Sequence, residues 1–169
     1  LAEALARCLG SMGAEIAGIG TPRRVVNGVR ELPPADAPMI PDRIEAGPLL
    51  VASAITGGDV EVTGVDPAHL GAVISKREAA GSSLETADTT LRLRAPERPE
   101  PINVTTKPYP GFPTDMQAQF MALLSVAKGA STIVDTIYHD RFTHVAELQR
   151  LGADIRVEGN TAFVQGVEG

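Results

Sequence analysis

Two copies of one sequence pattern decide the fold: PDRIEAGPLLVASAITG at residues 41–57 and PTDMQAQFMALLSVAKG at residues 113–129. Each copy has a proline, a capping residue (Asp42 or Thr114), a Glu or Gln three residues later, an apolar stretch and a closing glycine. The landmarks are 72 residues apart, since 113 − 41, 117 − 45 and 129 − 57 all equal 72. Such a capping box begins a helix, and a glycine in the left-handed conformation ends one. We therefore predict two equivalent helices.

Both predicted helices are followed by runs with high β propensity, at residues 60–62 and 132–134. A second pattern, a helix that stops on glycine and passes into a strand, recurs around Gly13, Gly81 and Gly152. These glycines are 81 − 13 = 68 and 152 − 81 = 71 residues apart. The last copy continues into a hairpin that turns at residues 158–160. The chain therefore reads as a repeat of about 70 residues with the order βαβαββ.

The predicted fold class is α/β, built from α+β-type repeats. A unit of this size cannot bury all its apolar helix faces alone, so it must pack against sister units. Five prolines interrupt the pattern between residues 21 and 41. We therefore place a domain boundary there, with residues 1–40 on one side and residues 41–169 on the other.

Composition excludes several functional classes. With 43% hydrophobic and 21% charged residues, the chain can bury a core, and we find no apolar run of about 18 residues that would span a membrane. A net charge of −6 and scattered Lys and Arg argue against nucleic acid as a partner. One cysteine, Cys8, excludes an internal disulfide and is typical of a cytoplasmic protein. The chain starts with Leu1 inside an apolar segment, so we predict no signal peptide and expect a piece of a longer protein.

The residues best suited to chemistry lie between positions 105 and 142. The proline-rich segment 107–113 leads to Asp115 at a predicted helix start, where backbone amides favour a carboxylate. Arg141 follows a predicted strand, where a guanidinium can bind phosphate or carboxylate. Without further information, the simpler explanations are preferred: a plain helix-start acid for Asp115 and a surface ion pair for Arg141. Arg43 occupies the position equivalent to Asp115, because 115 − 43 = 72, and the two opposite charges could face one cleft.

Metal and cofactor sites are not indicated. The three histidines, His69, His139 and His144, lack the spacings of a metal site, and neither a P-loop nor a dinucleotide-binding fingerprint is present. Cys8 lies on a predicted helix and is expected to pack as a small apolar residue. The methionines at 116 and 121 have helical spacing and are expected in the core.

Three segments carry a resemblance to a known family: PDRIEAG at 41–47, PGFPTDMQAQ at 110–119 and DTIYHDRF at 135–142. They resemble signature segments of the UDP-N-acetylglucosamine enolpyruvyl transferases, in the same order, and the resemblance extends over nearly the whole chain. It covers somewhat less than half of a family member.

The resemblance implies two similar domains of three βαβαββ units each, packed as the inside-out α/β barrel of the enolpyruvyl transferases, with the active site between them. Residues 1–40 would be the C-terminal part of one domain plus a linker. Residues 41–169 would be two of the three units of the other, the second incomplete. The implied reaction transfers the enolpyruvyl group of phosphoenolpyruvate to the 3-hydroxyl of UDP-N-acetylglucosamine in peptidoglycan synthesis, in the cytoplasm and without cofactors.

Site roles are also implied by the resemblance. Asp115 matches the family's aspartate that binds the sugar hydroxyl and is its proposed base, and Ile137 matches a residue that contacts the nucleotide sugar. Arg141 matches an arginine on the phosphoenolpyruvate side, and Arg43 matches a second cleft arginine.

Departures from the family limit what this chain can do alone. Cys8 does not match the family's general-acid cysteine, which lies in a mobile glycine-rich loop of the other domain. We therefore expect no turnover without the missing remainder of the enzyme. Two alternatives remain at this point: a catalytically silent binding or structural module of the same fold, and the sister family that acts on shikimate phosphate.

Overall fold

The computed structural model describes residues 2–168 and divides the chain into two compact units, residues 1–41 and 42–169. The first unit contains helix α1 (Ala2–Ser11) and an antiparallel pair of strands, β1 (Glu15–Ala17) and β2 (Val25–Asn27). From residue 28 to residue 41 its chain forms neither helix nor strand. Cys8 is half-buried on α1. The assignment of the two units to two domains of a larger enzyme remains a prediction.

The second unit holds two copies of the repeat. The first copy consists of α2 (Arg43–Ile55), β3 (Asp59–Thr63), η1 (Pro67–Leu70) with α3 (Gly71–Ala79), β4 (Ser83–Thr86) and β5 (Thr90–Arg94). The second consists of β6 (Val104–Thr105), η2 (Thr114–Met116) with α4 (Gln117–Leu124), β7 (Ala130–Val134), α5 (Val145–Arg150), β8 (Asp154–Glu158) and β9 (Thr161–Gln165). The second copy therefore has the full βαβαββ order, whereas the first begins at its helix.

Strand register repeats as well as strand order. The sheets run β3-β5-β4 in the first copy and β6-β7-β9-β8 in the second, with antiparallel pairing except between β6 and β7. Corresponding strands begin 71 residues apart, since 130 − 59, 154 − 83 and 161 − 90 all equal 71. This confirms the predicted α/β class and its repeat.

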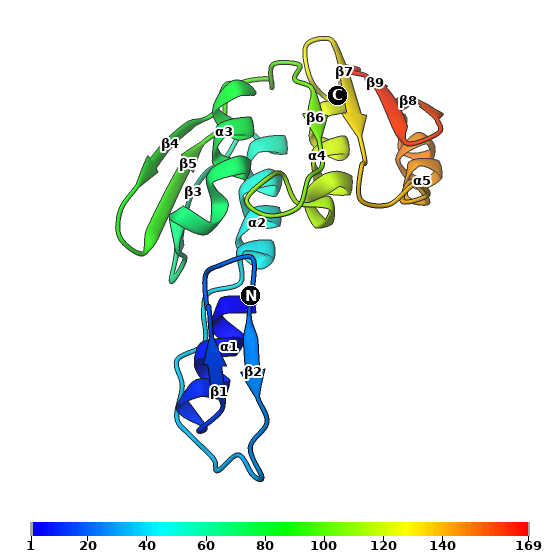
Figure 1. Cartoon of the computed structure of the whole chain (residues 1–169). Coiled ribbons are helices and arrows are strands. Elements are labelled where there is room, and N and C mark those ends of the chain that lie inside the picture. Colours follow the sequence, from blue (N-terminus) through cyan, green and yellow to red (C-terminus); the bar gives the residue numbers. More distant parts are fainter. Residues whose placement is uncertain (1, 169) are drawn as a thin grey trace. The chain divides into compact units, whose positions relative to one another are not determined.

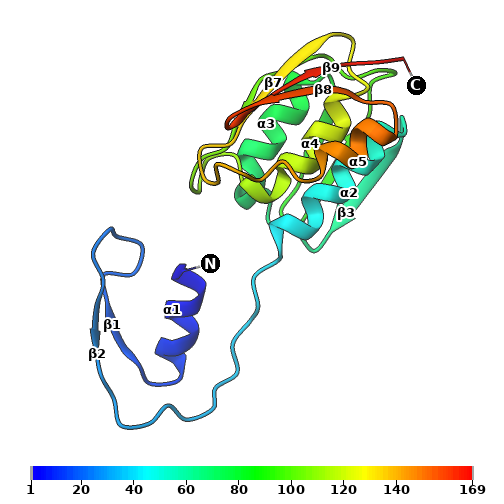
Figure 2. The ribbon, with the colours of Figure 1, turned by 90° about the vertical axis from the view of Figure 1, so that its right-hand side faces the viewer.

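Helices α2 and α4 form the middle of the second unit. Figure 1 shows them side by side between the two sheets, and the turned view of Figure 2 agrees. Helix α2 packs on β3 and β5, α4 packs on β7 and β9, and the two helices contact each other. The apolar faces of both helices thus become one core, as the sequence requires.

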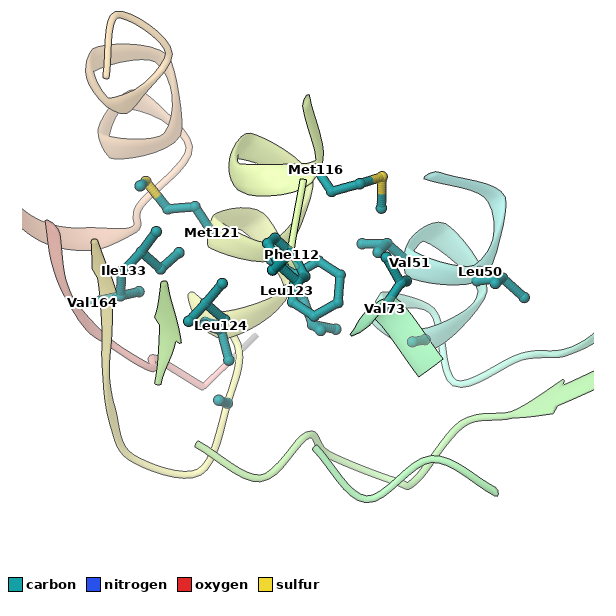
Figure 3. Close-up of a cluster of buried hydrophobic side chains, with 14 of the residues drawn as sticks. Leu50, Val51, Val73, Phe112, Met116, Met121, Leu123, Leu124, Ile133 and Val164 are labelled. Atoms are coloured by element: carbon teal, nitrogen blue, oxygen red, sulfur yellow. The ribbon is translucent and has the colours of Figure 1, made fainter. Parts of the chain in front are cut away.

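The core is continuous across the two copies. Its residues include Val51 of α2, Leu123 of α4 and Phe112, which precedes η2 (Figure 3). Phe112 packs edge-on against Phe120, with centroids 4.7 Å apart and planes at 81°. Met116 and Met121 are fully buried, as expected from their spacing.

The predicted cap by Asp42 and most of the predicted glycine stops are confirmed, although no hydrogen bond joins Glu45 to the Asp42 amide among residues 2–168. The Asp42 carboxylate accepts a hydrogen bond from the Ile44 amide at 2.7 Å, which caps α2, and Gly57 follows with φ +67°. Asp66 caps its turn through the Ala68 amide at 3.0 Å. The glycines at 13, 81 and 152 all have the predicted positive φ.

Two predictions for the second copy were wrong. Thr114 does not cap a helix: it is the first residue of η2, after Pro113, and its hydroxyl donates to Asp135 instead. Gly129 is not a left-handed helix stop, because α4 already ends at Leu124 and Gly129 lacks a positive φ. At Thr114, a carboxylate elsewhere in the fold replaced the local partner.

Arg77 is an anomaly in this core. It belongs to α3, and its fully buried guanidinium lies 6.0 Å from the centroid of the Phe120 ring. Its Nη2 donates to Ser82 Oγ at 2.7 Å. Its Nε and Nη1 find no acceptor among residues 2–168. Burial lowers the pKa of Arg77 to about 10, which means that the fold disfavours the charged side chain.

We expect Arg77→Met to raise the free energy of unfolding of this chain by about 1–3 kcal/mol, because two buried donors without acceptors disappear. Urea unfolding followed by circular dichroism measures this change. Arg156→Met is the control: its side chain is 70% exposed, so the change should stay within about 0.5 kcal/mol. A loss of stability in Arg77→Met larger than in the control would show that Arg77 stabilises the fold.

Candidate active site

Asp115 is presented by a loop that is anchored in the core. The loop closes through the Lys107 amide, which donates to the Phe112 carbonyl at 2.9 Å, and through the Gly111 amide, which donates to the Pro108 carbonyl at 2.8 Å. Phe112 is buried, so the chain leaves the core at a fixed point just before η2. The side chain of Asp115, three residues after Phe112, is 53% exposed. Its carboxylate is therefore held at the surface by a rigid segment.

Arg141 lies between β7 and α5 and reaches across to η2. Its Nη2 donates to Asp115 Oδ1 at 2.9 Å, and its Nη1 donates to Thr114 Oγ1 at 3.0 Å. The guanidinium also lies over the ring of Tyr138, 5.1 Å from the centroid, within cation–π range. The structure thus brings together the two charged residues that the sequence singled out.

The ion pair between Arg141 and Asp115 is open to solvent. Their side chains are 42% and 53% exposed, and exposed pairs of this kind contribute about 0–1 kcal/mol. Either group can therefore exchange its partner for a ligand at little expense. An anion would take the place of Asp115 on the guanidinium, and a hydroxyl would take the place of Arg141 on the carboxylate.

Asp135, directly after β7, is the buried counterpart of this exposed pair. Its side chain is fully buried and accepts four hydrogen bonds. Two come from the hydroxyls of Thr106 (2.8 Å) and Thr114 (2.7 Å), and two come from the backbone amides of Ile137 (2.9 Å) and Tyr138 (3.1 Å). One carboxylate therefore ties the loop after β6, the start of η2 and the segment after β7 to one another.

The charge state of Asp135 follows from these contacts. Burial is the largest single influence on its pKa and raises it, but the four hydrogen bonds together hold the pKa below its usual value. Asp135 is thus ionised at neutral pH and acts as an acceptor only.

Ile137 is exposed next to this buried carboxylate. Its amide donates to the Asp135 carboxylate, and the residue as a whole is 37% exposed. On the other side of the segment, the carbonyl of Arg141 accepts from Nε2 of the buried Gln117 at 3.2 Å. The segment 136–141 is therefore fixed at both ends while an apolar side chain and a guanidinium remain accessible.

Arg43 begins α2 and lies over the ring of Tyr109, 4.9 Å from the centroid. Among residues 2–168 it makes no ion pair with Asp115, whose carboxylate binds Arg141. The repeat register placed both residues at helix starts but did not indicate which charge each would meet.

Thr114 and Asp135 are the site residues that sequence reasoning missed. The sequence predicts Thr114 to be a helix cap, and Asp135 stands out only as the first residue of the segment 135–142. The one available signal was a carboxylate directly after a buried strand, a position where polar side chains are often functional.

Within residues 2–168, no group of His, Cys, Asp and Glu side chains is arranged to hold a metal ion. No helix of the described chain is both long and apolar enough to cross a bilayer.

Comparison with known proteins gives a consistent picture. The family model of EPSP synthase (3-phosphoshikimate 1-carboxyvinyltransferase) matches residues 2–168. A UDP-N-acetylglucosamine 1-carboxyvinyltransferase of Myxococcus xanthus is 52% identical over 167 residues, which is 99% of this chain and 40% of the relative. The protein of the same name from Xylella fastidiosa is 53% identical over 165 residues, which is 97% of this chain and 39% of the relative. The chain thus spans about 40% of the length of these relatives.

Two solved structures share the fold. The enolpyruvyl transferase NikO from Streptomyces tendae has a TM-score of 0.79 at 24% identity, over 93% of this chain and 38% of that one. EPSP synthase from Acinetobacter baumannii has a TM-score of 0.54 at 18% identity, over 96% of this chain and 38% of that one. These likenesses confirm the expected enolpyruvyl transferase fold. Because the family model covers all the residues described, this chain belongs to the EPSP synthase family of carboxyvinyl transferases.

Proposed function

We propose that this chain supplies one side of the active site of a UDP-N-acetylglucosamine 1-carboxyvinyltransferase. The proposed reaction transfers the enolpyruvyl group of phosphoenolpyruvate to the 3-hydroxyl of UDP-N-acetylglucosamine and releases phosphate. The observation that carries the proposal is the exposed pair of Asp115 and Arg141, 2.9 Å apart, on a buried polar scaffold. The Asp115 carboxylate can act as a base toward an alcohol, and the Arg141 guanidinium beside it can bind an anionic enol ester.

The roles follow from the chemistry of the two groups. Asp115 binds the acceptor hydroxyl and takes up its proton as the oxygen bonds to C2 of phosphoenolpyruvate. A positioned base of this kind contributes about 10² to 10⁴ in rate. Arg141 binds the anionic donor and stabilises the negative charge of the phosphate as the C2–O bond to it breaks. Neither role requires a metal or an organic cofactor.

Two further residues would complete this side of the site. Ile137 offers an exposed apolar contact to the nucleotide sugar, beside the segment that holds Arg141. Arg43 supplies a second positive charge, with its guanidinium supported by the ring of Tyr109. The acid that protonates C3 of phosphoenolpyruvate, and the base that removes a C3 proton as phosphate leaves so that the double bond re-forms, would come from outside this chain, because Cys8 does not match the family's cysteine.

The choice of acceptor rests on the relatives. Proteins named UDP-N-acetylglucosamine 1-carboxyvinyltransferase are 52–53% identical to this chain, whereas the EPSP synthase structure is 18% identical. The proposed activity would be a step of peptidoglycan synthesis, as the family resemblance of the sequence implies.

We expect this chain alone to release no phosphate from phosphoenolpyruvate. Joined to the remaining segments of the Myxococcus xanthus relative, in place of that protein's matching 167 residues, it should release phosphate in the presence of UDP-N-acetylglucosamine. We call this fusion the chimeric enzyme. A phosphate-release assay and titration calorimetry with UDP-N-acetylglucosamine test both proteins.

Three results would decide between the alternatives. Turnover by the chain alone would contradict the need for a general acid from elsewhere. Phosphate release with shikimate 3-phosphate but not with UDP-N-acetylglucosamine would assign the chain to the other acceptor. A folded chimeric enzyme that binds the nucleotide sugar without turnover would indicate a silent binding module.

Asp115→Asn in the chimeric enzyme should lower kcat by at least about 100-fold, because the amide cannot take up the hydroxyl proton. The fold should persist, since the ion pair that is lost is half-exposed. Asp154→Asn is the matched control, an exposed aspartate at the start of β8 that should leave kcat unchanged. An unchanged kcat in Asp115→Asn would remove Asp115 from the mechanism.

A further inference from the structure

We propose that Thr114 and Asp135 form a hydrogen-bonded relay that positions Arg141, anchoring its Nη1 to the protein and leaving its Nη2 free to exchange Asp115 for an anionic ligand. The hydrogen-bond chain is independent of the proposed function, whereas its role in substrate binding rests on that function. Both relay members are positioning residues, since they act on the ligand only through Arg141.

The direction of each hydrogen bond in the relay is fixed. A threonine hydroxyl has one proton, and an ionised carboxylate has none, so Thr114 must donate to Asp135 Oδ2, at 2.7 Å. The Thr114 oxygen then presents only lone pairs to the guanidinium, which always donates, at 3.0 Å. The order Arg141 to Thr114 to Asp135 therefore has no competing arrangement while the carboxylate is ionised.

Asp135 is the rigidly held anchor of this relay. Besides the four hydrogen bonds to its carboxylate, its own amide donates to the Asn160 carbonyl at 2.9 Å, and its carbonyl accepts from Asn160 Nδ2 at 3.1 Å. Thr106 is held in turn, because its hydroxyl oxygen also accepts from the Thr136 amide at 2.9 Å. The carboxylate is thus fixed from β6, from β7 and from the turn before β9.

The two edges of the Arg141 guanidinium differ in consequence. Nη1 points to Thr114, which is half-buried and backed by a buried charge, whereas Nη2 points to the exposed Asp115. When an anion approaches, the exposed contact is the weaker one and is replaced first. An arginine that already has one edge fixed loses less side-chain conformational entropy when it binds a ligand. The relay therefore pre-organises the guanidinium for binding phosphoenolpyruvate.

The geometric part is tested on this chain by nuclear magnetic resonance. The measured quantity is the order parameter of the Arg141 Nε–Hε bond, with the unfolding midpoint as a check on the fold. In Thr114→Val we expect the order parameter to fall from the rigid range to below about 0.6. Thr114→Ser keeps the hydroxyl and should restore it, and Asp115→Asn should leave it in the rigid range.

Controls keep this test decisive. Thr132→Val removes a half-buried hydroxyl from β7, away from the relay, and should leave Arg141 ordered. If Thr114→Val does not fold, Thr114→Ala makes the same test with a smaller side chain. An ordered Arg141 without the Thr114 hydroxyl, or a disordered one in Asp115→Asn, would overturn the relay.

The functional part is tested in the chimeric enzyme by a double-mutant cycle. Thr114→Val should raise the KM for phosphoenolpyruvate about tenfold, as expected for a lost hydrogen bond to a charged group, and leave the KM for UDP-N-acetylglucosamine unchanged. In an Arg141→Met background, Thr114→Val should have no further effect, because its partner is already gone.

The outcomes separate the two proposals. A chimeric enzyme that folds but lacks activity with Thr114 intact contradicts the proposed function, while the order parameter still decides the relay. An active enzyme in which Thr114→Val has the same effect with and without Arg141 overturns the relay and leaves the proposed function standing.

Discussion

The close approach of α2 to the start of α4 is the constraint on which the second unit depends. Gly47 of α2 faces Met116, and a Cβ at Gly47 would lie 2.6 Å from both Sδ and Cε of that methionine. Met116 is fully buried and directly follows Asp115. The packing that joins the two repeats therefore also fixes the position of Asp115 at the edge of the core. Fold and candidate site share this one contact.

Around that contact, the site combines a rigid interior with an exchangeable surface. The interior is the carboxylate of Asp135, whose hydrogen bonds reach three segments of the chain. The surface is the half-exposed pair of Asp115 and Arg141. Buried polar groups must be satisfied, so the interior contacts are costly to break, whereas the surface pair exchanges partners easily. Binding can therefore rearrange the outer contacts without disturbing the fold.

The sequence predicted the repeat and most helix ends because both depend on local chemistry. An aspartate cap such as Asp42 needs only the amide two residues later, and Gly81 or Gly152 needs only its own φ. Thr114 failed the same reasoning because a carboxylate 21 residues away competes for its hydroxyl. The pairing of Asp115 with Arg141, across 26 residues, was equally beyond local rules. Family resemblance named both residues, but it did not predict that they touch.

The two repeats differ at the positions that make chemistry possible. The register places Gly64 after β3 where Asp135 follows β7, since 135 − 71 = 64, and Asp42 where Thr114 stands, since 114 − 72 = 42. In the first repeat the carboxylate is at the helix start and caps its own helix. In the second repeat the carboxylate follows the strand, and the helix start carries a hydroxyl. The hydrogen bond from this hydroxyl to the carboxylate links η2 to the end of β7. In the second arrangement the Thr114 hydroxyl donates to Asp135 and its oxygen accepts from Arg141, so the strand end, the helix start and the surface arginine are joined.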